Sequence, residues 1–203
     1  MNIHASLLPK LRGAAPIQRS ILNNEKKTGI SFMKINEKLD SGPVCNKYSI
    51  DILEHDNTET LSEKLSYLST EKILENMQNV LEGEAIFKEQ DHAKATYAKK
   101  IQKVEGKIDW NNSASKIIAQ INGLYPKPGA WFEHNNKRYK ILKAKINKQS
   151  AIIGEVIDEQ MTIACGENSI NIIEIQKEGK NPQLIKEFLL GNKVRKGTII
   201  TSE

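Results

Sequence analysis

Residues 2–18 read NIHASLLPKLRGAAPIQ, and this stretch decides how the neighbouring sequence is interpreted. Residues 2–4 have the pattern of a strand that is ending, and residues 6–13 read as a loop. A helix is expected to begin at Pro16, because proline suits the first position of a helix, and Asn23–Asn24 can end it. The stretch therefore predicts a strand, a loop and a helix in succession.

Two strands and a long helix are expected next. Residues 29–35 and 44–50 are short, mostly apolar runs, and a Leu-Asp-Ser-Gly-Pro turn separates them. Thr60 and Glu63 have the spacing of a capping box, which predicts the start of a helix that stops near residue 83. The apolar side chains that recur at helical intervals are Leu61, Leu65, Leu68, Leu74, Met77 and Leu81. Strands that alternate with helices predict an α/β fold.

The remaining sequence predicts a linker and a second domain. Residues 84–108 are polar and aperiodic, which is typical of a surface linker. A helix is expected from Ser113 to Gly123, and another from Asn181-Pro182 to Gly191. Five short strands are predicted at residues 130–133, 138–146, 152–157, 161–165 and 170–175, with a hairpin turn at Asn135-Asn136. Short strands with one or two helices favour a small, partly open β-barrel.

Charge is distributed unevenly along the 203 residues. Residues 1–83 carry ten basic and eleven acidic side chains, whereas residues 84–203 carry twenty basic and fourteen acidic ones. The excess of basic residues in 84–203 suggests that this part of the chain binds a polyanion such as a nucleic acid. A lysine-rich solvated surface is the alternative explanation, and charge alone does not separate the two.

Several classes of protein are disfavoured by the sequence. The chain has no run of eighteen apolar residues, so no membrane span is expected, and its first residues do not resemble a signal peptide. Cys45 and Cys165 are predicted to be buried thiols rather than a disulfide pair. No cluster of cysteine and histidine suggests a metal site. The expected compartment is the cytoplasm, or an organellar matrix in a eukaryote.

Three polar side chains are candidates for catalysis. Asn2 and His4 lie two residues apart on an extended segment, so their side chains project to the same side. An amide donor beside an imidazole suits acyl transfer, because the amide can stabilise an oxyanion while the imidazole moves a proton. Asp40 can orient the histidine. An exposed terminal histidine and an ordinary Asp-Ser-Gly turn are the alternative interpretation.

The whole stretch resembles the signature of the folate-dependent formyltransferases, and the turn at residues 39–42 resembles their second signature. The resemblance implies a Rossmann-like catalytic domain that uses 10-formyltetrahydrofolate as co-substrate and needs no metal. It places Asn2, His4 and Asp40 at the catalytic positions. It also places Ser6, Leu7, Leu8 and Pro9 in the loop that contacts the folate.

Later segments are similar to the C-terminal domain of the methionyl-tRNA formyltransferases, among them Asn122–Trp131 and Glu187–Gly191. This implies an OB-like β-barrel that binds tRNA. The expected organisation is part of the catalytic domain at 1–83, a linker at 84–108 and the tRNA-binding domain at 109–203. The implied partner is initiator methionyl-tRNA, whose α-amine receives the formyl group, and a monomer is expected.

Contacts with tRNA are expected from basic side chains of one predicted strand. The expected phosphate contacts are Lys137, Arg138, Lys140 and Lys143. Side chains alternate over both faces of a strand, so not all of them can face one ligand. The aromatic side chains Tyr125, Trp131, Phe132 and Tyr139 suit either base stacking or the barrel core, and the core is favoured.

One departure from the family affects these expectations. Family members carry a longer N-terminal part, which supplies the first strands of the sheet and a wall of the pterin pocket. We therefore expect a fragment or a mis-started gene, weakly active and aggregation-prone by itself. Two further alternatives stay open: a formyltransferase for another amine such as an amino-sugar, and a non-catalytic protein that binds tRNA.

Overall fold

The computed structural model describes residues 1–192 and 194–201, and the chain forms two compact units, Met1–Ile101 and Gln102–Glu203. Each unit has its own sheet and its own hydrophobic core. Within the described residues, no helix combines the length and the apolar character needed to cross a membrane. The chain is a mixed α/β protein, as its alternating strand and helix patterns predict.

The sheet of the first unit has three antiparallel strands in the order β1-β3-β4. They are β1 (Asn2–His4), β3 (Lys27–Met33) and β4 (Val44–Asp51), so the predicted strands are confirmed with small shifts at their ends. The central strand β3 is buried from Thr28 to Met33. A strand that is covered on both faces needs apolar or small side chains at every position, which explains why the buried part of β3 combines apolar residues with glycine, serine and threonine.

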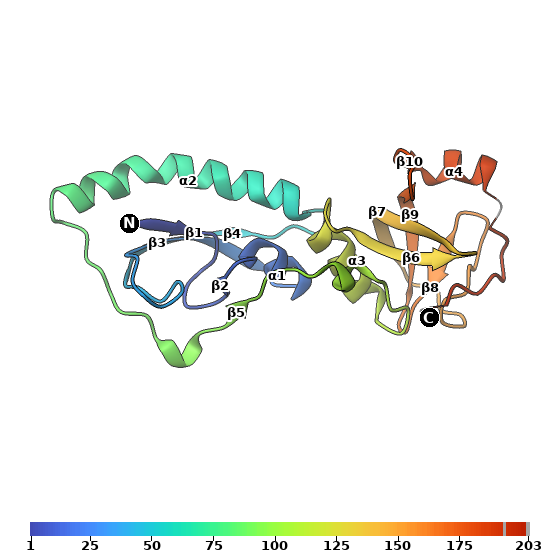
Figure 1. The fold of residues 1–203 in the computed structure, drawn as a ribbon, viewed down its shortest axis with the longest axis horizontal. Helices are drawn as coiled ribbons and strands as arrows, with labels where there is room; N and C mark the ends of the chain where they lie inside the picture. Colours follow the sequence, from blue (N-terminus) through green and yellow to red (C-terminus); the bar gives the residue numbers. More distant parts are fainter. Residues whose placement is uncertain (193, 202–203) are drawn as a thin grey trace. The chain divides into compact units, whose positions relative to one another are not determined.

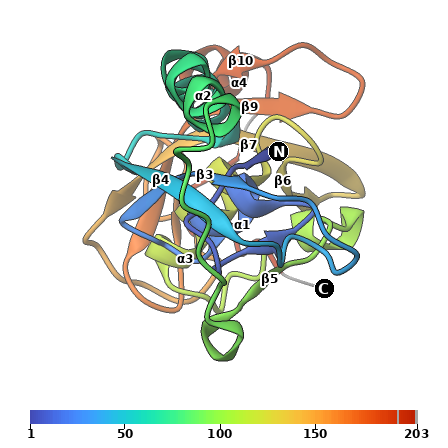
Figure 2. The ribbon, with the colours of Figure 1, turned by 90° about the vertical axis from the view of Figure 1, so that its left-hand side faces the viewer.

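Two helices pack against β3. They are α1 (Pro16–Leu22), which begins at the predicted proline, and α2 (Thr58–Leu81), which lies along one face of the sheet (Figure 1, Figure 2). Leu61 and Leu65 of α2 are almost fully buried, and they join Ile30 and Phe32 in one hydrophobic cluster. Complete burial of such a side chain stabilises the fold by about 1.5–3 kcal/mol, so these contacts fix α2 to the sheet.

The start of α2 differs from the prediction. The N-cap is Asn57, whose side chain accepts a hydrogen bond from the Thr60 N–H (2.9 Å), while the Thr60 hydroxyl accepts one from the Asn57 N–H (3.0 Å). Thr60 is therefore the third residue of the helix, and the predicted capping pair of Thr60 with Glu63 is wrong. Asparagine is as good an N-cap as threonine, and here it begins the helix one turn earlier.

The predicted apolar face of α2 is correct only over its first half. Leu74, Met77 and Leu81 are 76%, 45% and 82% exposed. In this half the buried side chain is Asn76, which donates to the Tyr48 hydroxyl at 3.0 Å. Helical periodicity identifies which side chains share a face, but it does not reveal whether another element lies opposite that face.

The backbone of residues 88–98 is hydrogen-bonded to earlier segments of the first unit. Lys88 forms a bridge with Val44, and β5 (Tyr97–Ala98) pairs in parallel with β2 (Arg12–Gly13). Between them, the 3-10 helix η1 (His92–Lys94) is exposed. Most of this part of the predicted linker is exposed, but Gln90 and Ala98 are buried, and the backbone bonds hold the segment next to the loop that follows β1.

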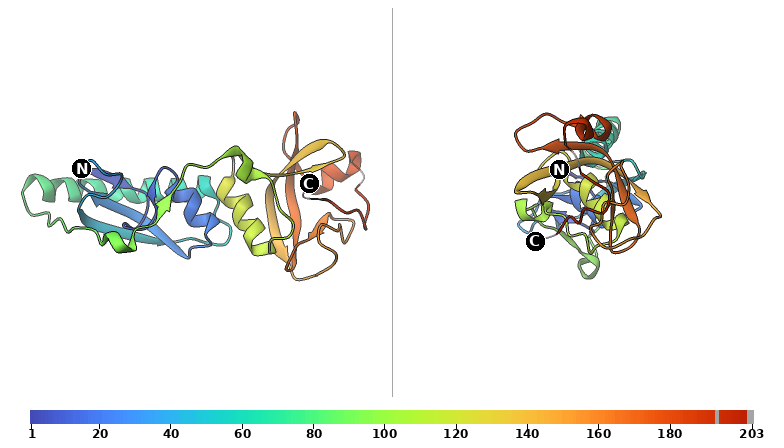
Figure 3. Two further views of the ribbon diagram at one scale, coloured as in Figure 1. Left: turned by 60° about the horizontal axis from the view of Figure 1, so that its bottom comes forward. Right: turned by 90° about the vertical axis from the view of Figure 1, so that its right-hand side faces the viewer.

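The second unit contains a five-stranded sheet that curls into half of a barrel (Figure 3). Its strands are β6 (Ala130–His134), β7 (Lys137–Asn147), β8 (Thr162–Ala164), β9 (Ser169–Lys177) and β10 (Gln183–Leu184). The long strand β7 has register shifts on both sides of Lys143. Such irregularities bend a strand and increase its twist, which suits a curled sheet.

The core of this unit lies between the sheet and α3 (Ala114–Leu124), which begins at the predicted N-cap Ser113. Phe132 and Tyr139 are 1% and 8% exposed, and their rings stack with centroids 5.5 Å apart. For these two aromatic residues, the core interpretation is therefore confirmed. The hairpin turn is also confirmed, because Asn135 and Asn136 have φ values of 51° and 56°, which a type I′ turn requires.

One predicted strand of the second unit is wrong, and the start of one predicted helix is wrong. Residues 152–157 do not form a strand but only isolated bridges at Glu155 and Val156, because Gly154 turns the chain with φ +79°. The last helix is α4 (Ile185–Gly191) and begins later than predicted. Gln183–Leu184 pair with β9 instead, since an edge of the sheet is available to them. A short 3-10 helix, η2 (Lys103–Gly106), precedes α3.

Candidate active site

His4 and Asp40 meet in the first unit. His4 is the last residue of β1, and Asp40 lies in the turn between β3 and β4. His4 Nδ1 and Asp40 Oδ2 are 3.5 Å apart, and the two side chains are only 7% and 16% exposed. The structure therefore brings together two of the three predicted catalytic residues in a place that is largely shielded from water.

The second ring nitrogen of His4 is also engaged. His4 Nε2 donates a hydrogen bond to the Leu11 carbonyl oxygen at 2.9 Å, since a carbonyl can only accept. Nε2 therefore carries a hydrogen, and Nδ1 faces the carboxylate. The imidazole therefore lies between two acceptors, the Leu11 carbonyl oxygen and the Asp40 carboxylate.

The same carboxylate oxygen of Asp40 is also bound by the loop after β1. Gly13 N donates to Asp40 Oδ2 at 2.8 Å. Gly13 has φ +118°, and a Cβ at this position would approach the Ala98 carbonyl oxygen to 2.8 Å, so only glycine fits. The parallel pairing of β2 with β5 thus positions the N–H group that fixes Asp40.

A buried pair of polar side chains supports the same turn. The Gln90 amide donates to the carbonyl oxygens of Asp40 (2.9 Å) and Gly42 (2.7 Å). Its oxygen accepts from Arg12 Nε (3.1 Å) and Nη2 (2.8 Å). Arg12 and Gln90 are 3% and 7% exposed. Gln90 lies in a polar stretch without periodicity, so no signal in the sequence identifies its role.

Asn2 lies two residues before His4 on β1, opposite Met33 of β3. Its side chain is half-buried and projects to the same side of the strand as His4. Among the described residues, no hydrogen bond joins the Asn2 amide to His4 or Asp40. The convergence of all three groups therefore stays a prediction.

The loop at residues 6–9 is held in place by hydrogen bonds to the sheet. The Ser31 hydroxyl of β3 donates to the Ser6 carbonyl oxygen (2.7 Å) and accepts from the Leu8 N–H (3.1 Å). Leu8 is 1% exposed and forms a small cluster with Met33 and Val44. The Leu8–Pro9 peptide bond is cis. The predicted folate-contacting loop is therefore a fixed part of the first unit.

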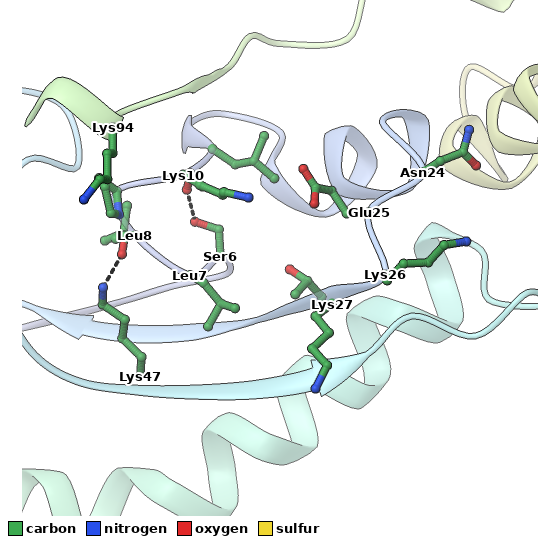
Figure 4. A pocket seen from close by; sticks show the side chains of 13 residues that line it. Ser6, Leu7, Leu8, Lys10, Asn24, Glu25, Lys26, Lys27, Lys47 and Lys94 are labelled. Carbon is green, nitrogen blue, oxygen red and sulfur yellow. Dashed lines mark hydrogen bonds between the residues drawn. The ribbon is translucent and has the colours of Figure 1, made fainter. Parts of the chain in front are cut away.

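An open pocket of about 860 Å³ lies beside this loop (Figure 4). Residues 6–11 form one wall, and the segment that leads into β3 forms another. The volume falls within the range of roughly 300–1,000 Å³ that is usual for small-molecule sites. Lys47 Nζ donates to the Leu8 carbonyl oxygen at one end of the pocket.

In the second unit, the four predicted tRNA contacts lie in different surroundings. Arg138 and Lys140 are half-buried on the face of β7 that turns away from the core, whereas Lys137 and Lys143 are exposed. The Arg138 guanidinium lies 3.9 Å from the centre of the Trp131 ring. Arg138, Lys140 and Trp131 line a pocket of about 490 Å³. Its other lining residues are Lys103, Val104, Lys127 and Pro128.

Comparison with known proteins identifies the class. The family model described as formyl transferase matches residues 1–77, and the one described as formyl transferase, C-terminal domain, matches residues 100–193. Together the two models account for most of the chain. The chain belongs to the formyl transferase family.

Curated relatives point to one group within this family. The chain is 60% identical, over all of its 203 residues, to the methionyl-tRNA formyltransferase of Pelagibacter ubique. It is 42% identical over 98% of its length to that of Caldanaerobacter subterraneus. The chain spans 66% of the length of each of these relatives.

Solved structures support the fold. A methionyl-tRNA formyltransferase from Clostridium thermocellum matches with a TM-score of 0.61 and 22% identity, over 71% of this chain and 62% of that chain. HypX from Aquifex aeolicus, solved with tetrahydrofolic acid, matches with a TM-score of 0.70 and 18% identity, over 97% of this chain and 38% of that chain. The predicted fold, part of a Rossmann-like domain followed by a small β domain, is confirmed.

Proposed function

We propose that this chain takes part in transferring a formyl group from 10-formyltetrahydrofolate to the α-amine of initiator methionyl-tRNA, for translation initiation. The contact between His4 and Asp40 is the observation that carries the proposal. The 60% identity to a methionyl-tRNA formyltransferase supports the choice of acceptor.

We assign these roles to successive parts of the chain. Residues 1–83 supply catalytic groups, residues 84–108 link the two domains, and residues 109–203 bind tRNA. The connecting part also stabilises the catalytic turn, because Gln90 donates to the Asp40 carbonyl. The protein acts as a monomer in the cytoplasm and uses no metal.

His4 is the group that handles charge and protons in this proposal. A carboxylate at Nδ1 and a carbonyl at Nε2 fix the orientation of the ring. A hydrogen-bond donor near the reacting carbonyl stabilises the negative charge that develops on its oxygen when the amine attacks. Asp40 orients the ring, and the pair takes up the proton that the amine loses. When the tetrahedral intermediate collapses, the bond between the formyl carbon and N10 of the folate breaks, N10 receives a proton, and tetrahydrofolate leaves. Acid–base assistance of this kind contributes roughly 10²–10⁴-fold to a rate.

Asn2 has the second role in this mechanism. Its amide donates a hydrogen bond to the same developing oxyanion from the side of β1 on which His4 lies. Loss of one such donor typically lowers the rate by about 10²–10³-fold. The strand fixes both donors relative to each other, so little reorganisation is needed during the reaction.

The pocket beside residues 6–9 fits part of a folate. Folate supplies the formyl group, and its p-aminobenzoyl-glutamate portion is an apolar ring with an anionic end. The pocket is lined by Leu7, by the largely buried Leu8 and Leu11 and by several lysines, a combination that matches that portion. Ser6, Leu7, Leu8 and Pro9 would hold it.

The second unit would bind the tRNA. Arg138 and Lys140 are the proposed main phosphate contacts, because they share one pocket with Trp131. Lys137 and Lys143 are exposed and add further contacts at the surface. A structured RNA is recognised mainly through its shape and backbone, so a rigid basic face suits this role.

A formylation assay tests the proposal. The purified chain is mixed in excess with methionyl-tRNA and labelled 10-formyltetrahydrofolate, and transfer of label is followed in a single turnover. An amino-sugar nucleotide serves as the competing acceptor. We expect label on methionyl-tRNA and none on the sugar.

Two results would contradict the proposal. Transfer to the sugar instead would support a formyltransferase of another specificity. Binding of tRNA with a steep salt dependence but no transfer of label would support a non-catalytic tRNA-binding protein. A His4→Gln variant is the control, because transfer that survives this change does not use the proposed site.

A further inference from the structure

Two pockets of the second unit adjoin each other and share two cationic side chains. One is the pocket of about 490 Å³ that contains Trp131, and the other, of about 300 Å³, is lined in part by Gln176 and Glu178. Arg138 and Lys140 line both of them. Both cations belong to β7, which pairs with β6 on one side and with β9 on the other, so they stand between the two pockets.

The register of the strands produces this arrangement. Trp131 lies opposite Lys140, and Lys140 lies opposite Gln176, so these three side chains form a row across the sheet. In the next row, Glu133 lies opposite Arg138. Side chains two positions apart on a strand project to the same face, so both rows lie on the face that turns away from the core.

The Trp131 ring belongs to this surface and not to the core. Among the described residues that form the hydrophobic core of the unit, Phe132 and Tyr139 are present and Trp131 is not. The Arg138 guanidinium lies 3.9 Å from the centre of the Trp131 ring, which is a stacking distance. A Cβ at Gly106 would lie 2.9 Å from two atoms of the ring, so helix η2 packs closely against it. The ring and the guanidinium therefore form a fixed platform on which a base can stack.

The two pockets differ in their chemistry. Pro128 and the Trp131 ring give the larger pocket an apolar part, whereas the smaller pocket is lined by polar side chains and by a glycine. In the smaller pocket, Gln176 Nε2 donates to the Lys180 carbonyl oxygen at 2.9 Å, which fixes the amide. The carboxylate of the exposed Glu178 lines the same pocket. A platform suits stacking with a base, and an amide with a carboxylate suits hydrogen bonds with the edge of a base.

The cations between the pockets are only weakly neutralised. Arg138 Nη2 lies 3.3 Å from Glu133 Oε1, and these side chains are 42% and 45% exposed. Exposed pairs of this kind are weak, so another anion can replace the carboxylate. In the part of the chain that the structure describes, no ion pair engages Lys140, Lys103 or Lys127. An anion held between the two pockets would therefore meet available positive charge.

We propose that this surface binds two consecutive unpaired nucleotides of the tRNA. The phosphate that joins them lies between Arg138 and Lys140, and one base extends the stack that Trp131 and Arg138 begin. The other base enters the smaller pocket, where Gln176 and Glu178 bind its edge. The inference rests on the proposed function, because the tRNA comes from there, and it adds contacts with bases to the contacts with phosphates.

The nucleotides must be unpaired for this geometry. In an RNA helix the bases are stacked on their neighbours and paired along their edges, so neither the face nor the edge of a base is available to a side pocket. An unpaired base can turn away from its neighbours and enter a pocket.

Binding of two short RNAs to the complete chain tests the inference. One is a labelled RNA of five uridines, and the other has the same backbone with abasic positions in place of the uracils. Uracil carries both an N–H donor and carbonyl acceptors, so it can pair with Glu178 and with Gln176. Fluorescence anisotropy should show that the RNA with bases binds at least about tenfold more tightly. This ratio should not change with salt, because both RNAs carry the same phosphates.

Three variants separate stacking from charge. Trp131→Leu should bring the ratio of affinities to within about twofold of one, because it removes the ring, whereas Trp131→Phe should retain most of the preference. Arg138→Lys keeps the positive charge but loses the plane, so it should lower the ratio by about threefold or more. Tyr67→Leu is the matched control, because Tyr67 is an exposed aromatic residue of the first unit, and it should leave the ratio unchanged.

Three results would overturn the inference: equal affinity of the unmodified chain for the two RNAs, no binding of either, or a preference that survives in Trp131→Leu. Filter binding of initiator tRNA to the same preparation separates this failure from a failure of the proposed function. A chain that binds the tRNA but does not prefer the RNA with bases recognises phosphates alone, and the proposed function stands. A chain that does not bind the tRNA counts against the proposed function itself.

Discussion

The side-chain amide of Gln90 donates a hydrogen bond to the backbone carbonyl of Asp40, at 2.9 Å, across fifty positions of sequence. The same side chain accepts hydrogen bonds from Nε and Nη2 of the buried guanidinium of Arg12, and Nη2 also lies 3.0 Å from His92 Nδ1. One amide thus joins the loop after β1 to the turn that presents the carboxylate to His4. The geometry of the candidate site depends on a residue that takes no part in the chemistry.

Replacing Gln90 should destabilise the fold. Gln90→Leu removes one of the partners of Arg12 and the donor to the Asp40 and Gly42 carbonyl groups, and the loss of these buried hydrogen bonds costs about 1–3 kcal/mol of unfolding free energy. Urea denaturation measures this loss. Gln78→Leu on the exposed side of α2 is the control and should change stability by less than about 0.5 kcal/mol. An equally small effect of Gln90→Leu would show that the turn does not depend on this amide.

Asp56 should make stability depend on pH. Burial alone would raise the pKa of Asp56, but hydrogen bonds from Lys64 and from the Leu53 N–H outweigh it, so the pKa lies below the ordinary value of 3.8. Because the folded-state pKa is lowered, the stabilisation is present above pH 3.8 and is lost as the pH falls through the folded-state pKa.

Asp56→Asn should therefore destabilise the chain at neutral pH, with a difference from the unmodified chain that shrinks in acid. Thermal unfolding between pH 7 and about pH 2.5 measures this difference. The matched control is Asp51→Asn, which removes an exposed carboxylate paired with Lys27. A difference for Asp56→Asn that stays constant down to the lowest pH would contradict the assigned role.

The two cysteines should react very slowly in the folded chain. Burial raises the pKa of the Cys165 thiol to about 12, and burial also raises the pKa of Cys45, which is only half-buried. The thiolate is the reactive form, so Cys165 should be alkylated by iodoacetamide more slowly than Cys45 at pH 8. In a Cys45→Ser variant, labelling should require denaturant. Rapid labelling of that variant without denaturant would show that the core of the second unit opens readily.

Contacts with tRNA should concentrate at one pocket of the second unit. Arg138→Gln and Lys140→Gln should each weaken tRNA binding and reduce the slope of log affinity against log salt by about 0.7–0.9, as expected for one phosphate contact. Lys143→Gln should have a smaller effect, because Lys143 lies outside the pocket formed with Trp131. Filter binding at several salt concentrations measures these slopes. Equal effects at all three positions would favour a diffuse basic surface.

The sequence predicts local features well where they depend on neighbouring residues. The strands β3 and β4, the proline that begins α1, the N-cap Ser113 and the hairpin turn at Asn135-Asn136 all follow from short-range patterns. The pairing of His4 with Asp40 could be predicted, because both residues lie in segments that resemble the two formyltransferase signatures.

Features that depend on contacts between residues far apart in the chain could not be predicted from the sequence. The role of Gln90 arises from hydrogen bonds with Arg12 and with the Asp40 turn, and no pattern in the sequence next to Gln90 indicates them. The exposure of Leu74 and Leu81 likewise depends on what lies opposite α2. The lysine-lined pocket exists only because four separate segments meet.

The central claim is that His4 and Asp40 act as one unit in formyl transfer. The most direct measurement is a double-mutant cycle in the single-turnover assay, with His4→Gln, Asp40→Asn and both together. We predict that each single change lowers the rate by about 10²-fold or more and that the double variant is little worse than either, because groups that act as a unit are not additive. Rates that fall independently and multiply in the double variant, or that do not fall at all, would contradict the account.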